Sequence, residues 1–449
     1  MSEVLGKEQL TRLLQDTLKF ARADQTEISF NGGTTALTRF ANNYIHQNVQ
    51  EHNTVIKVRS VFGQKVGIAS GNSLKPEDLK ALVQTAERLA KLQVVDPNFK
   101  SLPGSELVTA VNVPEPDAAT YNTDPQVRAH AASIICRKAE EQGIIASGAF
   151  RTQGFEVAVI NSLGLSNYYR GASSDIVTVI MGENSSGYAE RLSPRVSEID
   201  GEAIADEAIN KTLRSANPAP LEPGEYEVIL EEYAVSEMLS YMSFLGMGAQ
   251  SIQEGRSFMQ LERQLMNPLV TIYDDGSDPR NIIMPFDAEG VTRKRVNMIA
   301  AGVAKEVVYD TYTANREPGK STTGHSTGTQ NESGPIPLHL FMEAGDSSKE
   351  EMLKGIKRGV WVTRFHYVNP LVPDKAILTG MTRDGTFLIE NGEIVRPVKN
   401  LRFTQSAVEA LRDVTALTQN RILLPNFVFG SLVPAIRVGR FRFNSATEF

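Results

Sequence analysis

Apolar residues recur at helical spacing in several segments of the first half of the chain. A spacing of three to four residues predicts an amphipathic helix over residues 7–22 and another that begins at Pro76. A third helix is predicted to begin after Asp124, a favourable N-cap residue followed by Pro, and to stop near Gly143. Residues 204–213 show a further helical face. The first half of the chain is therefore predicted to contain at least four helices.

Alternation of apolar and polar residues predicts short strands between these helices. The segments with this alternation are residues 27–30, 35–40, 55–59, 155–160 and 165–169. Asn31-Gly32-Gly33 is predicted as a turn between the first two strands, and residues 161–164 as the turn of a later hairpin. Residues 93–123 contain four Pro and little periodicity, which predicts a linker or a long surface loop.

Strand patterns dominate after a break at residues 217–224, which hold three Pro. Helical faces recur only at residues 235–242 and 352–356, and Asn391-Gly392 is predicted as a hairpin turn. The predicted strands of this half are residues 228–230, 269–273, 303–312, 338–341, 361–368, 376–381 and 387–390. These patterns predict an α+β protein, in which an α/β N-terminal region precedes a large β-rich C-terminal domain of antiparallel sheet or sandwich type with a few helices. The predicted domains are residues 1–110, 118–216 and 220–449.

The composition is that of a globular protein and excludes several classes of function. Of the 449 residues, 41% are hydrophobic and 22% are charged, and the single Cys excludes an internal disulfide. A net charge of −7 argues against a general nucleic-acid binder, since such proteins neutralise phosphates with clustered Lys and Arg. No apolar stretch approaches the roughly 20 residues that cross a bilayer. The N-terminus also lacks the apolar segment of a signal peptide. We expect a cytoplasmic protein without a membrane or direct nucleic-acid partner.

The His residues do not form a metal-binding motif. No two of them have the spacing that places two imidazoles on one helix face. His325, His339 and His366 are far apart in sequence; a fold could gather them, or each could be a surface or hydrogen-bonded His. Residues 316–321 end like a phosphate-binding loop, but Ala314 stands where the first Gly belongs and a Pro removes an amide donor. We therefore reject a nucleotide site there.

One loop combines hydroxyl groups with a His. Residues 321–327 read Ser-Thr-Thr-Gly-His-Ser-Thr, which could hold a peptide backbone or an anion by hydrogen bonds, or could be a solvated polar loop. Asp274-Asp275-Gly276 and Asp384-Gly385 are predicted as turns without a catalytic role. The chemistry of the residues alone therefore identifies no reaction.

Several segments in a fixed order resemble the TldD/PmbA family, also called modulators of DNA gyrase. The N-terminal segment Thr38 to Asn48 is similar to the family's strand-and-turn signature, and residues 161–164 resemble its Asn-Ser-x-Gly turn. Most of the resemblance lies in the C-terminal half, at residues 267–276, 287–291, 323–324, 343–346 and 388–395. The ordered set extends over most of the chain.

The resemblance implies an α/β N-terminal part and a β-rich C-terminal domain. It also implies proteolysis of unfolded or extended peptides in a chamber formed by two subunits, of which one carries a His-Glu-x-x-x-His metal motif on a helix. The equivalent helix here should include residues 235–244, which contain no His. Thioether, alkyl and neutral hydroxyl groups are poor zinc ligands, so Met238, Leu239 and Ser243 could not hold the ion.

The chain is therefore identified as a PmbA/TldE-like, metal-free member of the family. We expect no metal, no cofactor and no catalytic residue in it. Its partner is expected to be a metal-bearing TldD-like paralogue or a second copy of itself, and its substrate an extended peptide. The candidate substrate-binding residues are Ser321, Thr322, Thr323, Gly324 and His325.

Two other functions compete with this assignment. The first is a stand-alone homodimeric binding or regulatory protein without hydrolytic activity. The second is a hydrolase that uses the dispersed ligands His325, His339 and His366. Light scattering with a peptide-cleavage assay would test the first alternative, and elemental analysis the second.

Overall fold

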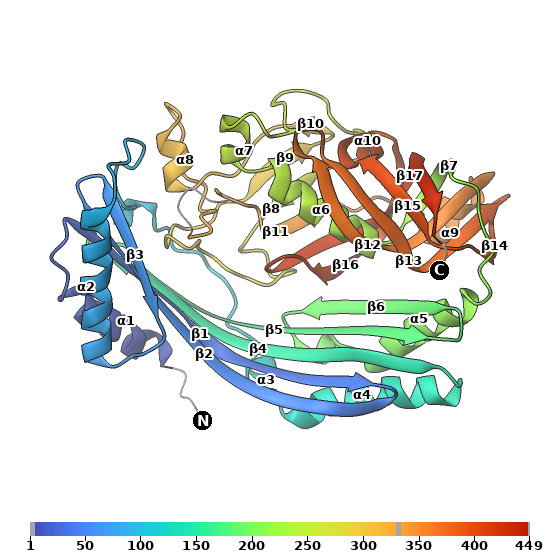
Figure 1. Cartoon of the computed structure of the whole chain (residues 1–449), viewed down its shortest axis with the longest axis horizontal. Coiled ribbons are helices and arrows are strands. Elements are labelled where there is room, and N and C mark those ends of the chain that lie inside the picture. The colour runs from blue at the N-terminus through green and yellow to red at the C-terminus, as the bar shows by residue number, and fades with distance from the viewer. Residues whose placement is uncertain (1–4, 329–333, 448–449) are drawn as a thin grey trace.

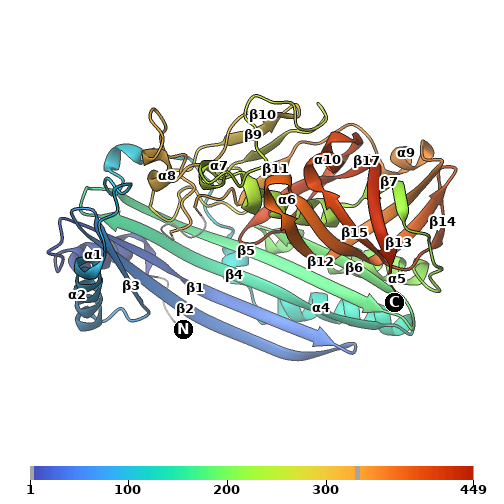
Figure 2. The ribbon, with the colours of Figure 1, turned by 45° about the horizontal axis from the view of Figure 1, so that its top comes forward.

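The computed structural model describes residues 5–328 and 334–447 of the chain. Its strands form two sheets, one of six strands and one of eleven. Figures 1 and 2 show the C-terminal half, which contains the second sheet, lying over one face of the first sheet. The α+β fold expected from the sequence, with a large β-rich C-terminal domain and few helices, is confirmed.

The first sheet is antiparallel throughout and has the order β3-β2-β1-β4-β5-β6. Four of its strands are long, so the sheet extends along the whole underside of the molecule in Figure 1. The strands are β1 (Gln25–Ala41), β2 (Tyr44–Phe62), β3 (Lys65–Gly71), β4 (Ile145–Asn161), β5 (Ser166–Met181) and β6 (Ser186–Ser193). The predicted hairpin around residues 161–164 is confirmed, since it joins β4 to β5.

Four helices cover the face of this sheet that is turned away from the C-terminal half (Figure 1). Two pack on Ile28 and Phe30 at one end, and two pack on Phe150 and Ile176 at the other. The predicted start after Asp124 is confirmed, because its side chain accepts a hydrogen bond from the Gln126 N–H at 2.8 Å. The helices are α1 (Gly6–Leu18), α2 (Pro76–Leu92), α4 (Pro125–Glu141) and α5 (Gly201–Arg214).

The predicted turn at Asn31-Gly32-Gly33 is wrong, because these residues lie inside the continuous strand β1. Gly33 is required there by packing rather than by a turn. A Cβ at this position would lie 2.3 Å from the carbonyl oxygen of Gly154 on the neighbouring strand. The chain reverses instead at Asn42 and Asn43, which have φ values of 50° and 63°. Asn adopts this left-handed conformation readily, and two such residues suit a tight hairpin.

The second sheet has the order β10-β9-β8-β11-β17-β15-β13-β12-β7, with β14 paired to β13 and β16 to β17. Because β17 also pairs with β7, five strands from β7 to β17 close into a ring. The strands are β7 (Gly224–Leu230), β8 (Ile272–Asp274), β9 (Val296–Ala300), β10 (Val303–Ala304), β11 (His339–Met342), β12 (Arg358–Val372), β13 (Ile377–Glu390), β14 (Glu393–Pro397), β15 (Leu401–Ser406), β16 (Val414–Pro425) and β17 (Gly430–Ala446). The predicted turn at Asn391-Gly392 joins β13 to β14.

One helix, α6 (Glu232–Gly246), lies in the core of the C-terminal half. Its apolar residues are buried on several sides, in agreement with the apolar face predicted at residues 235–242. The other helices of this half are short: α7 (Ala249–Gln253), α8 (Thr311–Asn315), α9 (Lys349–Lys354) and α10 (Ala407–Arg412).

Two predictions for the C-terminal half are wrong in part, and several strands were missed. The strand predicted at residues 303–312 is limited to β10, because the Asp310 side chain accepts the Thr313 N–H at 2.7 Å and starts helix α8. Asp384-Gly385 is not a terminal turn but lies within β13, where the buried Asp384 pairs with Arg364 at 2.6 Å. Strands β14 to β17 were not predicted at all.

Residues 93–123 pack between the two halves. They contain the short helix α3 (Ala118–Tyr121) and are otherwise mostly irregular, as expected for a long surface loop. The Thr109 N–H donates to Oγ1 of Thr292 at 2.9 Å, which ties this segment to the C-terminal half. Strands from both sides of the segment share the first sheet. The division into three domains at 1–110, 118–216 and 220–449 stays a prediction. No helix within the described part of the chain is long and apolar enough to cross a membrane.

Candidate functional site

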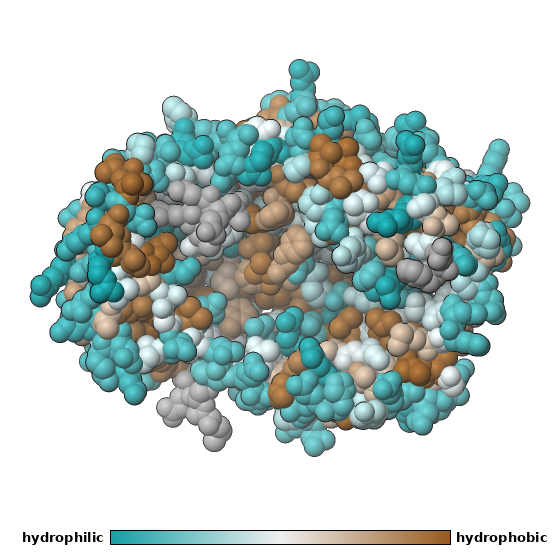
Figure 3. All heavy atoms as spheres, viewed as in Figure 1, coloured by the Kyte–Doolittle hydropathy of each residue, from teal (hydrophilic) through white to brown (hydrophobic). Residues whose placement is uncertain are grey.

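A cavity of about 810 Å³ lies between the two halves of the molecule. Figure 3 shows hydrophobic side chains gathered in the hollow that separates the halves. One side of the cavity is a continuous block of the first sheet. In this block Ser29 is paired with Lys57 and Val159, and Asn31 with Val55 and Val157. These six side chains alternate along their strands with residues that pack under α1 and α2, and they therefore share the opposite face.

The other sides of the cavity come from the C-terminal half and are mainly apolar. They include the end of α6 and three loops that are far apart in sequence. The apolar side chains that line the cavity from this half are Tyr241, Phe244, Met284, Phe286, Ala288, Ile336, Leu338, Pro370, Phe427, Val428 and Phe429. A mainly apolar cavity of several hundred Å³ with few polar groups is typical of a ligand-binding site.

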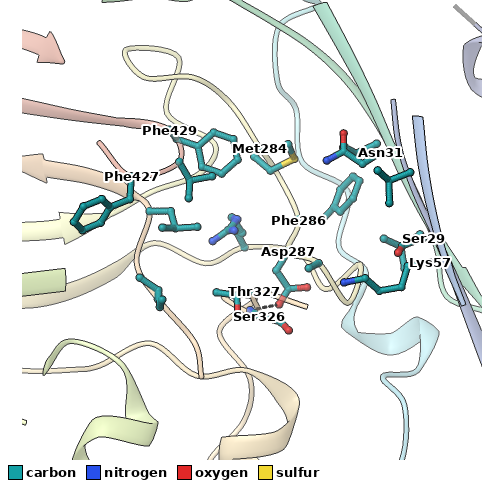
Figure 4. Close-up of a pocket in the computed structure, with 18 of the residues that line it drawn as sticks. Ser29, Asn31, Lys57, Met284, Phe286, Asp287, Ser326, Thr327, Phe427 and Phe429 are labelled. Carbon is teal, nitrogen blue, oxygen red and sulfur yellow. Dashed lines mark hydrogen bonds between the residues drawn. The ribbon is translucent and has the colours of Figure 1, made fainter. Parts of the chain in front are cut away.

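Polar groups gather where residues 287 and 326 meet. The Asp287 carboxylate accepts hydrogen bonds from the backbone N–H groups of Ser326 at 2.8 Å and of Glu289 and Val291 at 3.0 Å each. Figure 4 shows Asp287 beside Ser326 and Thr327, with Lys57 approaching from β2. Burial, together with the nearby Glu289 carboxylate, raises the pKa of Asp287 to about 8. The one carboxyl group among the described residues that line the cavity is therefore disposed to hold its proton.

A buried ion pair network connects the two halves next to the cavity. The Arg59 guanidinium donates to Glu27 at 2.6 Å and to Glu289 of the C-terminal half at 3.1 Å. Burial raises the pKa of Glu27 to about 7, even though Arg59 opposes this shift. Glu289 also accepts the Thr311 N–H at 3.2 Å. The network fixes the position of the 287–289 segment against the first sheet.

A second buried cluster lies at the end of β8. Asp274 was expected in a turn, but it is the fully buried last residue of β8. Its carboxylate bonds to Nε2 of His325 at 2.9 Å and accepts the His339 backbone N–H at 2.7 Å. Burial would raise the pKa of Asp274, but His325 lowers it to about 2. The carboxylate therefore serves as a structural acceptor that stays ionised.

Two of the three dispersed His residues are close together, and the third is not. Asp274 bonds both His325 and His339, and His339 stacks on Phe429 with ring centroids 4.2 Å apart. Burial lowers the pKa of His339 to about 3, so it is neutral. His366 lies on β12, where its charged neighbours are mainly Arg residues. The geometry gives the proposed set of three His ligands no support.

The loop of candidate binding residues lies behind the cavity. Thr322 and Thr323 donate to the Tyr309 carbonyl oxygen, and His325 is fully buried against Asp274. The alternative of a solvated polar loop is therefore wrong, because tertiary packing buries most of it. None of Ser321, Thr322, Thr323, Gly324 and His325 lines the cavity, whereas the next two residues of the chain do. A direct role of these five residues in substrate binding stays a prediction.

A smaller polar recess of about 210 Å³ adjoins the large cavity, with which it shares Tyr241 and Phe427. Helix α6 contributes Glu237 to this recess, and β6 contributes Glu190. Burial raises the pKa of each of these two carboxyl groups to about 7. Arg364 also lines the recess and partly offsets this effect by its positive charge.

The side chains of the polar recess do not fit a zinc ion. A protein zinc site needs three or four His, Cys or carboxylate ligands. Within residues 5–328 and 334–447, no group of three or more His, Cys, Asp and Glu side chains is arranged to hold a metal ion. The recess offers two carboxyl groups with raised pKa values, together with hydroxyl groups and an Arg.

The sequence patterns do not single out the charged residues Lys57, Arg59, Asp287 and Arg293. Lys57 and Arg59 belong to a segment predicted as a half-buried strand. The one local sign of a functional role is that these two charged residues alternate with apolar ones. Asp287 appeared only as part of a family-like motif. Burial of a charge depends on contacts between distant segments, which local periodicity does not report.

The sequence matches two known domains. Residues 26–90 match the PmbA/TldA metallopeptidase domain 1, and residues 223–445 match the PmbA/TldA metallopeptidase C-terminal domain. Metalloprotease PmbA of Escherichia coli is 23% identical over 92% of this chain and 91% of its own length. An uncharacterised protein of Methanocaldococcus jannaschii is 24% identical over 65% of this chain and 69% of its own length.

Solved structures share the whole fold. TldE from Thermococcus kodakarensis has a TM-score of 0.89 at 21% identity, covering 97% of this chain and all of the other. A Thermotoga maritima protein described as a candidate modulator of a DNA gyrase has a TM-score of 0.85 at 18% identity, with coverage of 97% and 100%. At these identities the likeness concerns the fold, whereas the two matched domains together span most of the chain. The chain therefore belongs to the TldD/PmbA family of metallopeptidase-related proteins.

Proposed function

We propose that this chain is the PmbA/TldE-like subunit of a TldD/TldE-type metallopeptidase system that degrades unfolded or extended peptides. In this proposal the chain holds no metal itself and depends on a metal-bearing TldD-like partner for hydrolysis. The single observation that carries the proposal is the donor set of α6.

Helix α6 contains no His. Met238, Leu239 and Ser243 have the spacing of a His-Glu-x-x-x-His motif but carry thioether, alkyl and hydroxyl groups. The donors that the helix presents to the polar recess are Ser236, Glu237 and Tyr241. Neutral hydroxyl groups are weak zinc ligands, so Glu237 is the one good zinc donor among these three.

The adjoining cavity supports a role in holding peptide substrate. Its volume of about 810 Å³ lies within the range of roughly 300–1,000 Å³ that is usual for ligand sites. Its apolar surface suits the side chains of an unfolded segment, which a folded protein would keep inside its core. In the proposal, this chain binds the peptide, and the partner would hold the metal that hydrolysis requires.

The test is reconstitution with a paralogue from the same genome that carries the His-Glu-x-x-x-His motif. The two chains are co-expressed with a tag on one of them, and the purified material is assayed on an unfolded peptide. We expect the chains to co-purify and the pair to cleave the peptide, whereas this chain alone does not. A partner variant with the motif Glu changed to Gln is the control, because it should preserve assembly and abolish cleavage.

Two results would contradict the proposal. One is a stable homodimer that ignores every metal-bearing paralogue, which would favour the stand-alone binding protein. The other is peptide cleavage by this chain alone that persists after treatment with a chelator, which would place catalysis on its own residues.

A further inference from the structure

The large cavity is apolar but carries an unbalanced charge. Among the residues that the structure describes, three with ionisable side chains line the cavity: Lys57, Asp287 and Arg293. Two of these are basic, and they come from different halves of the molecule. Asp287 is already bonded to three backbone N–H groups, and its carboxyl group has a pKa of about 8, raised by burial and by Glu289. The cavity therefore presents net positive charge at neutral pH.

Arg293 is only 7% exposed, yet it lacks the partners that a buried guanidinium requires. Its Nε and Nη1 atoms have no hydrogen-bond partner among the described residues. Buried polar groups are nearly always hydrogen-bonded, and an unpaired buried charge costs several kcal/mol or more. Gly276 provides the space for this side chain, since a Cβ there would lie 2.4 Å from Arg293 Cδ. The fold thus holds an unsatisfied guanidinium at the edge of the cavity.

The nearby carboxylates do not neutralise Arg293 directly. Asp274 and Asp287 both act on it electrostatically, but neither forms an ion pair with it within 4.0 Å in the described part of the chain. The Asp274 oxygens are bonded to His325 and to the His339 N–H. Arg293 consequently keeps donor capacity for an anion that comes from outside the chain.

We infer that the cavity binds a carboxylate carried on an apolar body, with Arg293 as the anion partner and Lys57 as a second positive charge across the cavity. The source that fits the proposed function, on which this assignment rests, is the free C-terminal end of an extended apolar peptide. The phenyl and aliphatic side chains around the cavity bind the apolar body, and the guanidinium pairs with the terminal carboxylate. A peptide held in this way has its end and its register fixed.

Binding of matched peptides to the purified full-length chain tests this inference. The probe is a short peptide of Leu, Val and Ala with an N-terminal fluorophore, used with a free C-terminal carboxylate or as the C-terminal amide. Fluorescence anisotropy gives the two dissociation constants. Charge-assisted hydrogen bonds to Arg are strong, so we expect the free acid to bind at least about tenfold more tightly than the amide. Equal affinities would overturn the inference.

Variants of this chain assign the effect to the cavity. Arg293→Gln should abolish the preference for the free acid, and Lys57→Gln should reduce it. Arg137→Gln removes an equal charge from an exposed position on α4 and should leave the preference unchanged. If Arg293→Gln does not fold, Lys57→Gln and the comparison of acid with amide on the unmodified chain still decide the matter. An unchanged preference in Lys57→Gln would then count against the site.

Competition with decanoate distinguishes the two sources of such a carboxylate. Displacement of the free-acid peptide by decanoate is expected, since both ligands present a carboxylate on an apolar body. Binding of decanoate without any binding of the peptide would support the carboxylate site and overturn its assignment to a peptide end. Binding of neither would overturn the inference as a whole, while the proposed function would still be judged on the reconstituted pair.

Discussion

Arg59 donates to Glu289 at 3.1 Å, although the two residues are 230 positions apart in sequence. The contact joins β2 of the first sheet to the loop that carries Asp287 into the cavity. Glu27 accepts from the same guanidinium at 2.6 Å, so one buried cation serves two buried carboxylates. The shape of the cavity therefore depends on an ion network that neither half of the molecule could form alone.

Removal of Arg59 should destabilise the protein strongly. Arg59→Met leaves Glu27 and Glu289 buried without their counter-charge, and we expect the free energy of unfolding to fall by about 3–5 kcal/mol. Denaturant-induced unfolding measures this change. The control is Arg137→Met, which breaks exposed pairs with Glu141 and Glu202 and should cost about 1 kcal/mol or less. Similar losses in both variants would contradict the structural role of the network.

Asp287 should make the stability depend on pH. Its folded pKa of about 8 lies above the usual value of 3.8, so the folded state binds more protons than the unfolded state between these values. Its contribution to stability is therefore present at low pH and is lost as the pH rises towards about 8. In Asp287→Asn, this part of the pH dependence should disappear.

Unfolding free energies at pH 5 and pH 8.5 measure the effect. The unmodified chain should lose at least about 1 kcal/mol more over this interval than Asp287→Asn, since one pKa unit corresponds to roughly 1.4 kcal/mol. The comparison concerns the slope and not the absolute stability, because Asn replaces an acceptor of three N–H groups. Parallel pH profiles would contradict the raised pKa of this group.

Gly33 should not tolerate a side chain. A Cβ there would lie 2.3 Å from the Gly154 carbonyl oxygen, so Gly33→Ala must force β1 away from β4 and should cost about 1–3 kcal/mol. Gly71→Ala is the matched control, because its Cβ would meet Leu82 at an ordinary distance of 3.7 Å. Thermal unfolding of both variants measures the difference. A turn at Gly33, as its sequence suggests, would instead make the two substitutions similar.

A charge on the sheet side of the cavity should impair peptide binding without harming the fold. Val55 lines the cavity and is 48% exposed, so Val55→Glu can fold while it places a carboxylate among apolar side chains. We expect peptide affinity to fall by about tenfold or more, which corresponds to roughly 1.4 kcal/mol. Val94→Glu is the control, since Val94 is 81% exposed and does not line the cavity. Equal peptide affinity in the two variants would show that the peptide does not bind in this cavity.

Local signals in the sequence predicted much of the secondary structure. The start of α4 at Asp124 was recognised because a cap acts within one turn of its own residue. Gly33 was misread because the same residue type serves turns and close strand contacts, and only the neighbouring strand distinguishes them. Asp274 was misread in the same way, since its partner His325 lies 51 residues away.

The candidate site was harder to predict than the fold. The absence of His from α6 could be read directly from the sequence, and it still carries the functional proposal. The cavity could not be foreseen, because its lining comes from β1, β2, β4 and three distant loops. Arg293 in particular stands in a segment without periodicity, and its importance arises only from its burial without a partner.

Zinc binding by the purified chain alone tests the central claim most directly. The chain is stripped with a chelator, dialysed against a small excess of zinc and analysed for bound metal. The donor set of Ser236, Glu237 and Tyr241 on α6 predicts no stoichiometric zinc and an unchanged melting temperature. One zinc ion bound tightly per chain, with a raised melting temperature that is lost in Glu237→Gln, would contradict the assignment of a metal-free subunit.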